Sequence, residues 1–200
     1  MHFYRPAEGH RLTHDPFNSI VAPRPIGWIG TVDAEGRRNL APHSFFNALH
    51  YRPPLIGFSS NGWHDTAANC DATREFTWNL VTLELAEQMN ATSTTHQVDE
   101  FEVAGLEAAP SCEIAAPRVA KSPVNFECRV TQLVPLQSAQ GAAVGSWFVV
   151  GEVVGVHIDE SLITDGVFDT VAADPLLRAG GPTTYFRLDP ASRLDLRRPE

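Results

Sequence analysis

The sequence predicts a mainly β protein, an antiparallel barrel or sandwich with a few short helices. Strand-like runs outnumber helical ones, and they are rich in Val, Ile, Phe and Trp between clusters of Gly, Pro or Asn. The two kinds of run do not alternate regularly, which disfavours a doubly wound parallel sheet. Five runs predict strands: Ile26–Val32, Leu55–Ser60, Phe76–Val81, Phe126–Val134 and Trp147–Ile158.

Capping residues and helix formers predict the few helices. Asp65 or Thr66 is a candidate N-cap for the first of them, and Leu, Ala, Glu and Gln favour the second. The polar, Pro-punctuated residues 91–123 predict one long excursion inside a single domain, 1–200. The four helical segments expected are Asp65–Asp71, Leu83–Asn90, Glu160–Asp165 and Pro175–Arg178.

Composition restricts the classes of function. The chain has 200 residues, of which 43% are hydrophobic, enough for a substantial core. No apolar run approaches the roughly 18 residues of a membrane span, and the N-terminus lacks the apolar region of a secretory signal. We therefore expect a cytoplasmic protein without a membrane contact. The net charge of −9 gives little attraction to a phosphate backbone, so no nucleic acid is expected as partner.

The cysteines and histidines predict no metal site. Cys70, Cys112 and Cys128 are odd in number and widely spaced, which is typical of free thiols in a reducing compartment. His10 and His14 are four residues apart, but no Glu follows His10 as a zincin motif requires. A G-x-S-x-G elbow is also missing, so a hydrolase lacks its central feature.

Residues 23–47, PRPIGWIGTVDAEGRRNLAPHSFFN, predict a hairpin with Gly36 at a turn position that favours positive φ. We expect the backbone to leave the sheet along the segment that contains Asn39, Ala41 and Ser44. Because Pro42 lacks an N–H, ladder pairing should stop there and free the amides of His43 and Ser44 for a ligand. A ligand site and an ordinary hairpin both remain open.

Residues 55–69 predict a strand, a small polar loop and the start of a helix. Hydroxyl groups, free N–H groups and the helix dipole at such a junction suit a phosphate, although neither a P-loop nor a dinucleotide motif is present. The alternative is a capped turn on the surface. The residues concerned are Ser59, Ser60, Asn61, Gly62 and Thr66.

Other polar residues are weaker candidates. Asp99 and Glu100 are adjacent, so their side chains diverge and suit a cap or a solvated loop better than a carboxylate dyad. His157 is either a proton donor or a partly buried strand histidine, with no cysteine or carboxylate partner evident for it. Arg178 and Tyr185 lie in a tail that contacts a ligand or docks as a terminal strand.

Taken together, these segments resemble the flavin reductase-like family of FMN-binding split-barrel proteins, which includes flavoredoxin and the small reductase components of two-component monooxygenases. The matching pieces follow the family order and cover most of the chain. They are APRPIGWIGTVDAEGRRNLAPHSFFN (22–47), PPLIGFSSN with HDTAAN (53–69), EFTWNL (75–80), MNATS (89–93), VDEFEVAGL (98–106), FECRV (126–130), VVGEVVGVHID (149–159) and RAGGPTTY (178–185).

The resemblance implies an antiparallel Greek-key split β-barrel and a homodimer with FMN, or alternatively FAD, at or near the subunit interface. It implies an isoalloxazine site at Thr31, Asn39, Ala41, Pro42, His43 and Ser44. It places the ribityl phosphate at Ser59, Ser60, Asn61 and Thr66, and brings Asn90, Ser93, Arg178 and Tyr185 to the pocket. Many family members carry Lys just before Asp-Thr, where this chain has His64, which predicts looser and pH-sensitive FMN binding.

The implied activity is an NAD(P)H:flavin reductase that transfers a hydride from NAD(P)H to flavin N5. The flavin carries this chemistry, so no catalytic side chain is expected. Reduced flavin would leave for a partner monooxygenase or pass electrons to another acceptor. The alternative is a non-enzymatic, flavoredoxin-like electron carrier. A metal-free hydrolase is a third hypothesis, for which no triad is readable.

Overall fold

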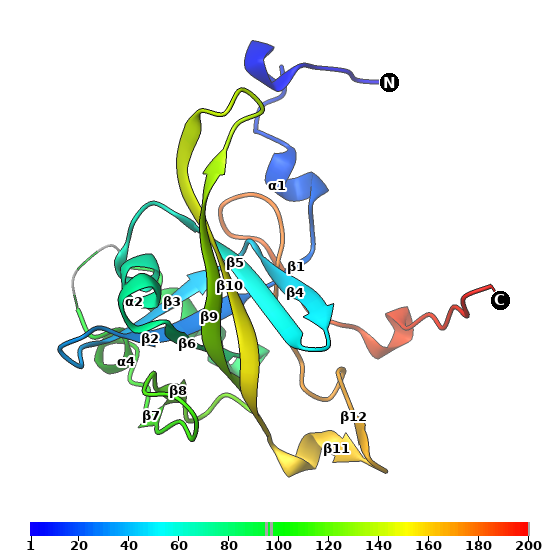
Figure 1. Cartoon of the computed structure of the whole chain (residues 1–200). Coiled ribbons are helices and arrows are strands. Elements are labelled where there is room, and N and C mark those ends of the chain that lie inside the picture. The colour runs from blue at the N-terminus through cyan, green and yellow to red at the C-terminus, as the bar shows by residue number, and fades with distance from the viewer. Residues whose placement is uncertain (95, 97, 200) are drawn as a thin grey trace.

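A seven-stranded antiparallel sheet forms the centre of the computed structural model, which describes residues 1–94, 96 and 98–199 (Figure 1). Its strand order is β3-β2-β6-β9-β10-β5-β4, and every neighbouring pair is antiparallel. The mainly β prediction is confirmed, and each predicted strand falls in this sheet. The strands are β2 (Gly27–Val32), β3 (Arg38–His43), β4 (Phe46–Tyr51), β5 (Pro54–Asn61), β6 (Glu75–Asn79), β9 (Val124–Gln137) and β10 (Ala143–Ile158).

Shorter elements surround this sheet. The α-helices are α1 (Phe17–Ile20), α2 (Asp65–Thr73), α3 (Ala86–Ala91) and α4 (Glu100–Val103). Short 3-10 turns are η1 (Pro6–Glu8), η2 (Leu83–Leu85), η3 (Glu160–Leu162) and η4 (Pro190–Ser192). Minor strands form a sheet of β1 (Arg24–Pro25), β13 (Leu177–Arg178) and β14 (Tyr185–Phe186), and the pairs β7 (Ala108–Ala109) with β8 (Arg118–Val119) and β11 (Ile163–Thr164) with β12 (Val167–Phe168). None of the described helices has the length and apolar character that crossing a membrane requires.

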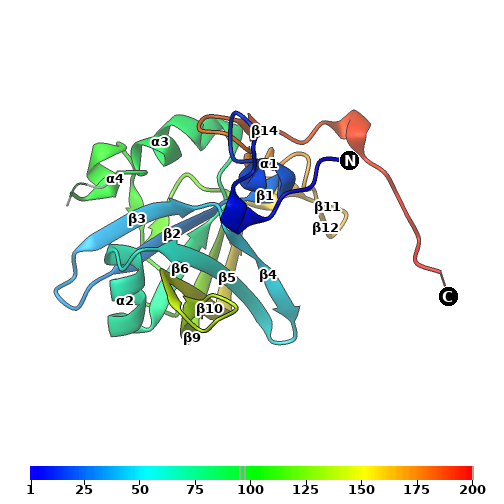
Figure 2. The ribbon, with the colours of Figure 1, turned by 90° about the horizontal axis from the view of Figure 1, so that it is seen from above.

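The apolar run of β2 is continuous because both of its faces are buried. Ile29 packs with Phe58, Phe76 and other residues of the first hydrophobic cluster, whereas Trp28 packs with Leu40 and other residues of the second. Seen from above, α3 and α4 lie on one side of the β2–β3 hairpin and α2 lies on the other (Figure 2). The hairpin is thus held from both sides, which fixes the outer edge of β3.

Three of the expected helical segments have wrong boundaries. The turn expected over Glu160–Asp165 ends at Leu162, and Ile163–Thr164 forms the strand β11. Leu177–Arg178 forms β13 and pairs with β1 instead of forming a helical turn, since Pro175 already bridges to Thr82 in an extended conformation. The N-cap of α2 is His64, with extended φ and ψ of −102° and 175°, and its side chain makes no capping hydrogen bond. Asp65 and Thr66 therefore lie inside the first helical turn.

Replacing Gly151 with alanine should destabilise the sheet by about 2 kcal/mol, the usual cost of overpacking a core. A Cβ atom at this β10 position would lie 2.4 Å from Cε1 of Phe76, and that ring is fully buried. Urea denaturation measures the change. The second substitution Phe76→Leu should recover part of the loss in the Gly151→Ala background, and an additive pair would contradict this contact.

Candidate functional site

A cavity of about 680 Å³ opens where the edge of β3, the end of β5 and the start of α2 meet the segment after α3. It brings together most of the site residues predicted from the sequence. These are Asn39, Ala41, Pro42, His43, Ser44, Ser59, Ser60, Asn61, His64, Thr66 and Ser93. Two separate segments, residues 39–44 and 59–66, therefore form neighbouring walls of one site.

Four predicted residues do not line this cavity. Thr31 is buried behind it, where its Oγ1 accepts hydrogen bonds from Asn39 and Asn69. Asn90 is an exposed residue of α3. Arg178 stacks on Tyr185, with its guanidinium 4.8 Å from the ring centroid, and donates to carbonyls of its own tail. Direct contact of these four residues with a flavin stays a prediction.

The ladder between β2 and β3 does not stop at Pro42, because Gly27 still pairs with His43. The reason is that β3 is an edge strand, and the Leu40 N–H donates outward to Oε2 of Glu100, at 3.1 Å. Alternation then turns the nitrogen of Pro42 outward as well, where no ladder hydrogen bond is lost. By the same alternation the amide of His43 faces β2, so only the Ser44 amide faces outward, contrary to our expectation.

A buried hydrogen-bond network ties the β2–β3 hairpin to the first turn of α2. Asn39 Nδ2 donates to Thr31 Oγ1 at 3.0 Å and to Thr66 Oγ1 at 3.1 Å. Because the Thr66 oxygen accepts from Asn39, its own proton is directed elsewhere, and the side chain lines the cavity. Thr66 is thereby fixed as a hydroxyl donor at a helix N-terminus, which is a suitable position for an anion.

The loop before α2 is held by β10. Gly62 N–H donates to the Gly145 carbonyl at 3.0 Å, and Ser146 Oγ donates to Asn61 Oδ1 at 3.1 Å. Because Oδ1 of Asn61 accepts this hydrogen bond, the amide nitrogen of the same side chain can donate to other partners. Ser60 differs from its neighbour, since its hydroxyl donates to the Gly62 carbonyl at 2.9 Å. The loop therefore offers Asn61 as a donor more readily than Ser60.

The imidazole of His64 lies directly against the backbone of Gly62. A Cβ atom at Gly62 would be 2.3 Å from His64 Nε2, and the Gly62 φ is +108°. Only glycine satisfies both conditions without strain. Gly62 thus permits His64 to fold over the loop and line the cavity.

His43 presents an unpaired acceptor. Its Nδ1 lies 3.2 Å from the Ser59 carbonyl, which only accepts, so this nitrogen carries the proton. Nε2 is then an acceptor, and it is buried without a hydrogen-bond partner among the described residues. Burial lowers the pKa of His43 to about 4, the Ser59 carbonyl opposes that shift, and His64 adds to it. At neutral pH the ring is uncharged.

Sequence reasoning missed the acidic wall of the cavity. Glu100 begins α4, is 5% exposed and lines the cavity. Burial raises its pKa, the Leu40 N–H opposes the shift, and the charges of Asp65 and Asp99 add to it. Asp99 instead caps α4 and pairs with Arg38, so the two adjacent carboxylates diverge as expected. Among the described lining residues no Lys or Arg occurs.

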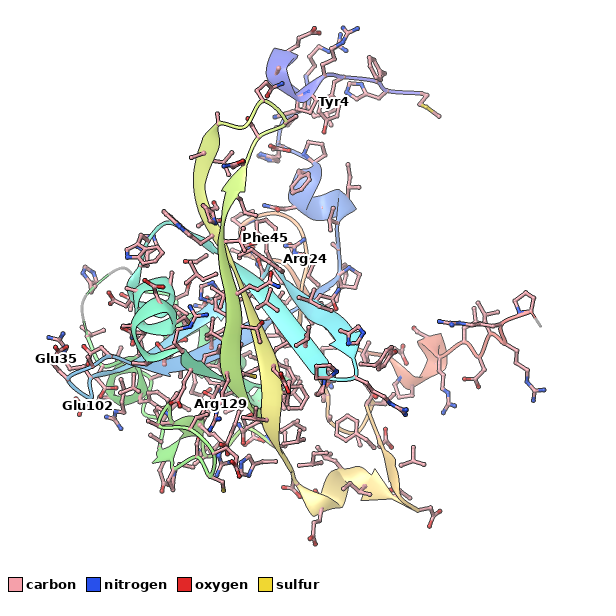
Figure 3. The ribbon with its side chains drawn as sticks, in the orientation of Figure 1. Tyr4, Arg24, Glu35, Phe45, Glu102 and Arg129 are labelled. Atoms are coloured by element: carbon pink, nitrogen blue, oxygen red, sulfur yellow. The ribbon has the colours of Figure 1, made fainter. Side chains whose placement is uncertain are left out.

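Arg24 was also missed, although it supports the wall formed by Ser44 and Phe45. Its buried guanidinium donates to the Ser44 carbonyl at 3.0 Å and to the Asn18 carbonyl at 2.7 Å. It lies 5.5 Å from the centroid of the Phe45 ring (Figure 3). Arg24 thus joins the N-terminal segment to the β3–β4 junction, a long-range role that no local pattern reveals.

The expectation that His157 has no carboxylate partner is wrong. His157 Nε2 lies 2.5 Å from Oε1 of Glu127, whose side chain is fully buried. The two residues are 30 positions apart and meet because β9 and β10 are paired. This pair lies outside the residues that line the cavity described above.

Comparisons with known proteins show the family to which the chain belongs. The family model described as "Flavin reductase like domain" matches residues 20–181. An uncharacterised protein of Deinococcus radiodurans is 33% identical over 198 residues, which cover 92% of this chain and 84% of that protein.

Two solved structures share the fold over nearly the whole chain. Nitrilotriacetate monooxygenase component B from Bacillus cereus has a TM-score of 0.87 and 26% identity, covering 98% of both chains. A split-barrel protein from Shewanella frigidimarina, assigned as a flavin reductase, has a TM-score of 0.79 and 30% identity, covering 90% of this chain and 89% of that one. The chain therefore belongs to the flavin reductase-like domain family.

Proposed function

We propose that the chain binds FMN in this cavity and works as an NAD(P)H:flavin reductase. The observation that carries the proposal is that two complementary kinds of group line one cavity. The Thr66 hydroxyl and the uncapped N-terminus of α2 suit a phosphate. The buried, unpartnered Nε2 of His43 is an acceptor that needs an N–H donor. FMN has both groups, a phosphate and the ring N3–H.

The side chains of this site would bind and orient the cofactor. Thr66, Asn61 and Ser59 would hold the phosphate through hydroxyl and amide donors, and the outward edge of β3 from Ala41 to Ser44 would lie beside the ring. Nε2 of His43 would accept a hydrogen bond from the ring. When bound, the flavin supplies the chemistry by accepting a hydride from NAD(P)H and passing reducing equivalents onward. No protein nucleophile is required.

The test is the visible spectrum and the nucleotide oxidation of the purified protein. We expect FMN to bind with a perturbed flavin spectrum, and NADH or NADPH to be oxidised only when FMN is present. Binding without oxidation of either nucleotide would instead support the electron carrier. A protein that binds neither FMN nor FAD would overturn both functions, and a comparison of the two flavins decides which one is preferred.

His64→Lys should tighten FMN binding several-fold, by about 1 kcal/mol, because an ammonium is a stronger phosphate partner than a neutral imidazole. Fluorescence titration of FMN at several salt concentrations measures the affinity. The gain should shrink as salt rises. The matched control is His50→Lys, at an exposed histidine of β4 that does not line the cavity. Equal affinities for His64→Lys and wild type would contradict a phosphate beside residue 64.

The remaining expectations are also proposals. We propose a homodimer, supported by three exposed apolar residues of β10, Val154, Val156 and Ile158; sedimentation velocity tests it. A separate monooxygenase as acceptor of reduced flavin is supported by the similarity to the monooxygenase component B of Bacillus cereus. The free thiols of all three cysteines suit the cytoplasm.

A further inference from the structure

Three metal-binding side chains converge outside the flavin cavity. Cys112 lies in the excursion after β7, Glu127 lies on β9 and His157 lies on β10. One ligand atom from each of the three is within 4.8 Å of the other two. No local motif indicates this cluster, because its members are 15 and 30 residues apart and only the fold brings them together.

The loop that carries Cys112 is held in place by its backbone. The N–H groups of Cys112 and Glu113 donate to the two carboxylate oxygens of Glu127, at 2.8 and 2.6 Å. The Ala115 N–H donates to Glu75 Oε2 at 2.8 Å, and Arg129 donates to the Glu113 carbonyl at 3.2 Å. The position of Cys112 beside the carboxylate therefore does not depend on its thiol.

The carboxylate of Glu127 is fully buried and faces both the loop that carries Cys112 and the ring of His157. A thiolate, an imidazole and a carboxylate form a typical donor set for Zn²⁺, which tolerates mixed S, N and O ligands. Cys112 is exposed and the His157 side chain is 29% exposed, so an ion can enter from solvent.

We propose that Cys112, Glu127 and His157 bind Zn²⁺, with water at the fourth position, and so attach the excursion to the β9–β10 hairpin. His157 Nε2 lies 2.5 Å from Glu127 Oε1, so the imidazole shifts outward to admit the ion, and the ring carries its proton on Nδ1 when Nε2 binds the ion. The Cys112 thiol releases its proton to solvent on binding, and no oxidation or reduction takes place.

Thiol alkylation offers a selective test, because Cys112 is exposed whereas Cys70 and Cys128 are buried. Under native conditions iodoacetamide should therefore modify Cys112 first, as located by peptide mass spectrometry. Added Zn²⁺ should slow this reaction about tenfold at ten times its dissociation constant, since the bound thiolate is withdrawn from reaction. EDTA should restore the original rate.

Substitutions show whether the protection comes from this cluster. His157→Gln removes a ligand at a partly exposed position and should abolish protection by Zn²⁺. The matched control is His50→Gln, at an exposed histidine of β4, which should keep full protection. If Zn²⁺ leaves the alkylation rate of Cys112 unchanged in the wild type, or protects the His157→Gln variant equally well, the site does not exist.

Co²⁺ provides a second, spectroscopic readout. Titration of the wild type with Co²⁺ should produce a thiolate charge-transfer band and visible bands of tetrahedral intensity, and Cys112→Ser should lose the charge-transfer band. The FMN titration should be the same with and without Zn²⁺, since none of the three residues lines the flavin cavity. A failure of FMN binding would therefore leave this test intact. A Co²⁺ spectrum without a thiolate band would overturn the assignment of Cys112.

Discussion

In the His43→Gln variant, much of the loss of stability that the wild type shows between about pH 6.5 and pH 4 should disappear. Burial lowers the pKa of His43 from 6.5 to about 4, so the unfolded chain binds a proton in this range that the folded chain does not. The free energy of unfolding then falls as the pH falls, by up to about 3 kcal/mol at this one residue. Above pH 6.5 the ring is neutral in both states and the contribution is complete.

Urea denaturation at pH 4.5, 5.5 and 7 measures this effect as a difference between variant and wild type. The difference is needed because burial raises the pKa of Glu100 in the same cavity. The contribution of Glu100 to the free energy of unfolding therefore changes with pH in the opposite direction to that of His43. His50→Gln, at an exposed ring of β4, is the control and should retain the wild-type slope. A His43→Gln protein with the wild-type slope would show that residue 43 is accessible to protons in the folded state.

Asn79→Ala should lower the free energy of unfolding by about 3 to 5 kcal/mol, the sum expected when a buried polar network loses its central member. Asn79 is fully buried, and its Nδ2 donates to the Trp28 carbonyl at 3.0 Å. Its Oδ1 accepts from the Val119 N–H and from Asn125 Nδ2, both at 2.8 Å. Alanine would remove all three hydrogen bonds, and Asn125 Nδ2 would keep only its long contact of 3.4 Å with the Val119 carbonyl.

Gln132→Ala, at an exposed amide of β9, is the control for Asn79→Ala and should change stability by less than about 0.5 kcal/mol. Guanidinium denaturation followed by tryptophan fluorescence and by circular dichroism checks that unfolding remains two-state. A loss below about 1 kcal/mol for Asn79→Ala would mean that water replaces the missing amide. That result would contradict the close packing of β2 and β6 against the excursion.

Local pattern was sufficient for most strands of the large sheet, although it did not predict β4 (Phe46–Tyr51). The apolar runs around Trp28, Phe58 and Val149 are strands because their side chains pack on one or both faces, and the sequence shows this alternation directly. Hydroxyl and amide residues at the end of β5 likewise predicted a polar cavity wall before α2. These features arise from neighbours in sequence, so they are visible before folding.

The features that sequence reasoning missed depend on distant segments. Glu100 reaches the cavity because α4 packs on β3, where its carboxylate accepts the Leu40 N–H from 60 residues away. Glu127 meets His157 only through the β9–β10 register. The end of pairing predicted at Pro42 was wrong because an edge strand tolerates proline, and edge position is a property of the whole sheet.

The outer edge of β3 also bears on aggregation. An unpaired strand edge is normally a template on which a strand of another chain can add. Here the outward Leu40 amide is occupied by Glu100, Pro42 offers no amide, and the Arg38 side chain is held by Asp99 and Phe101. A foreign strand would therefore find fewer free N–H donors along this edge. The cavity can thus stay open to a small molecule without exposing the sheet to polymerisation.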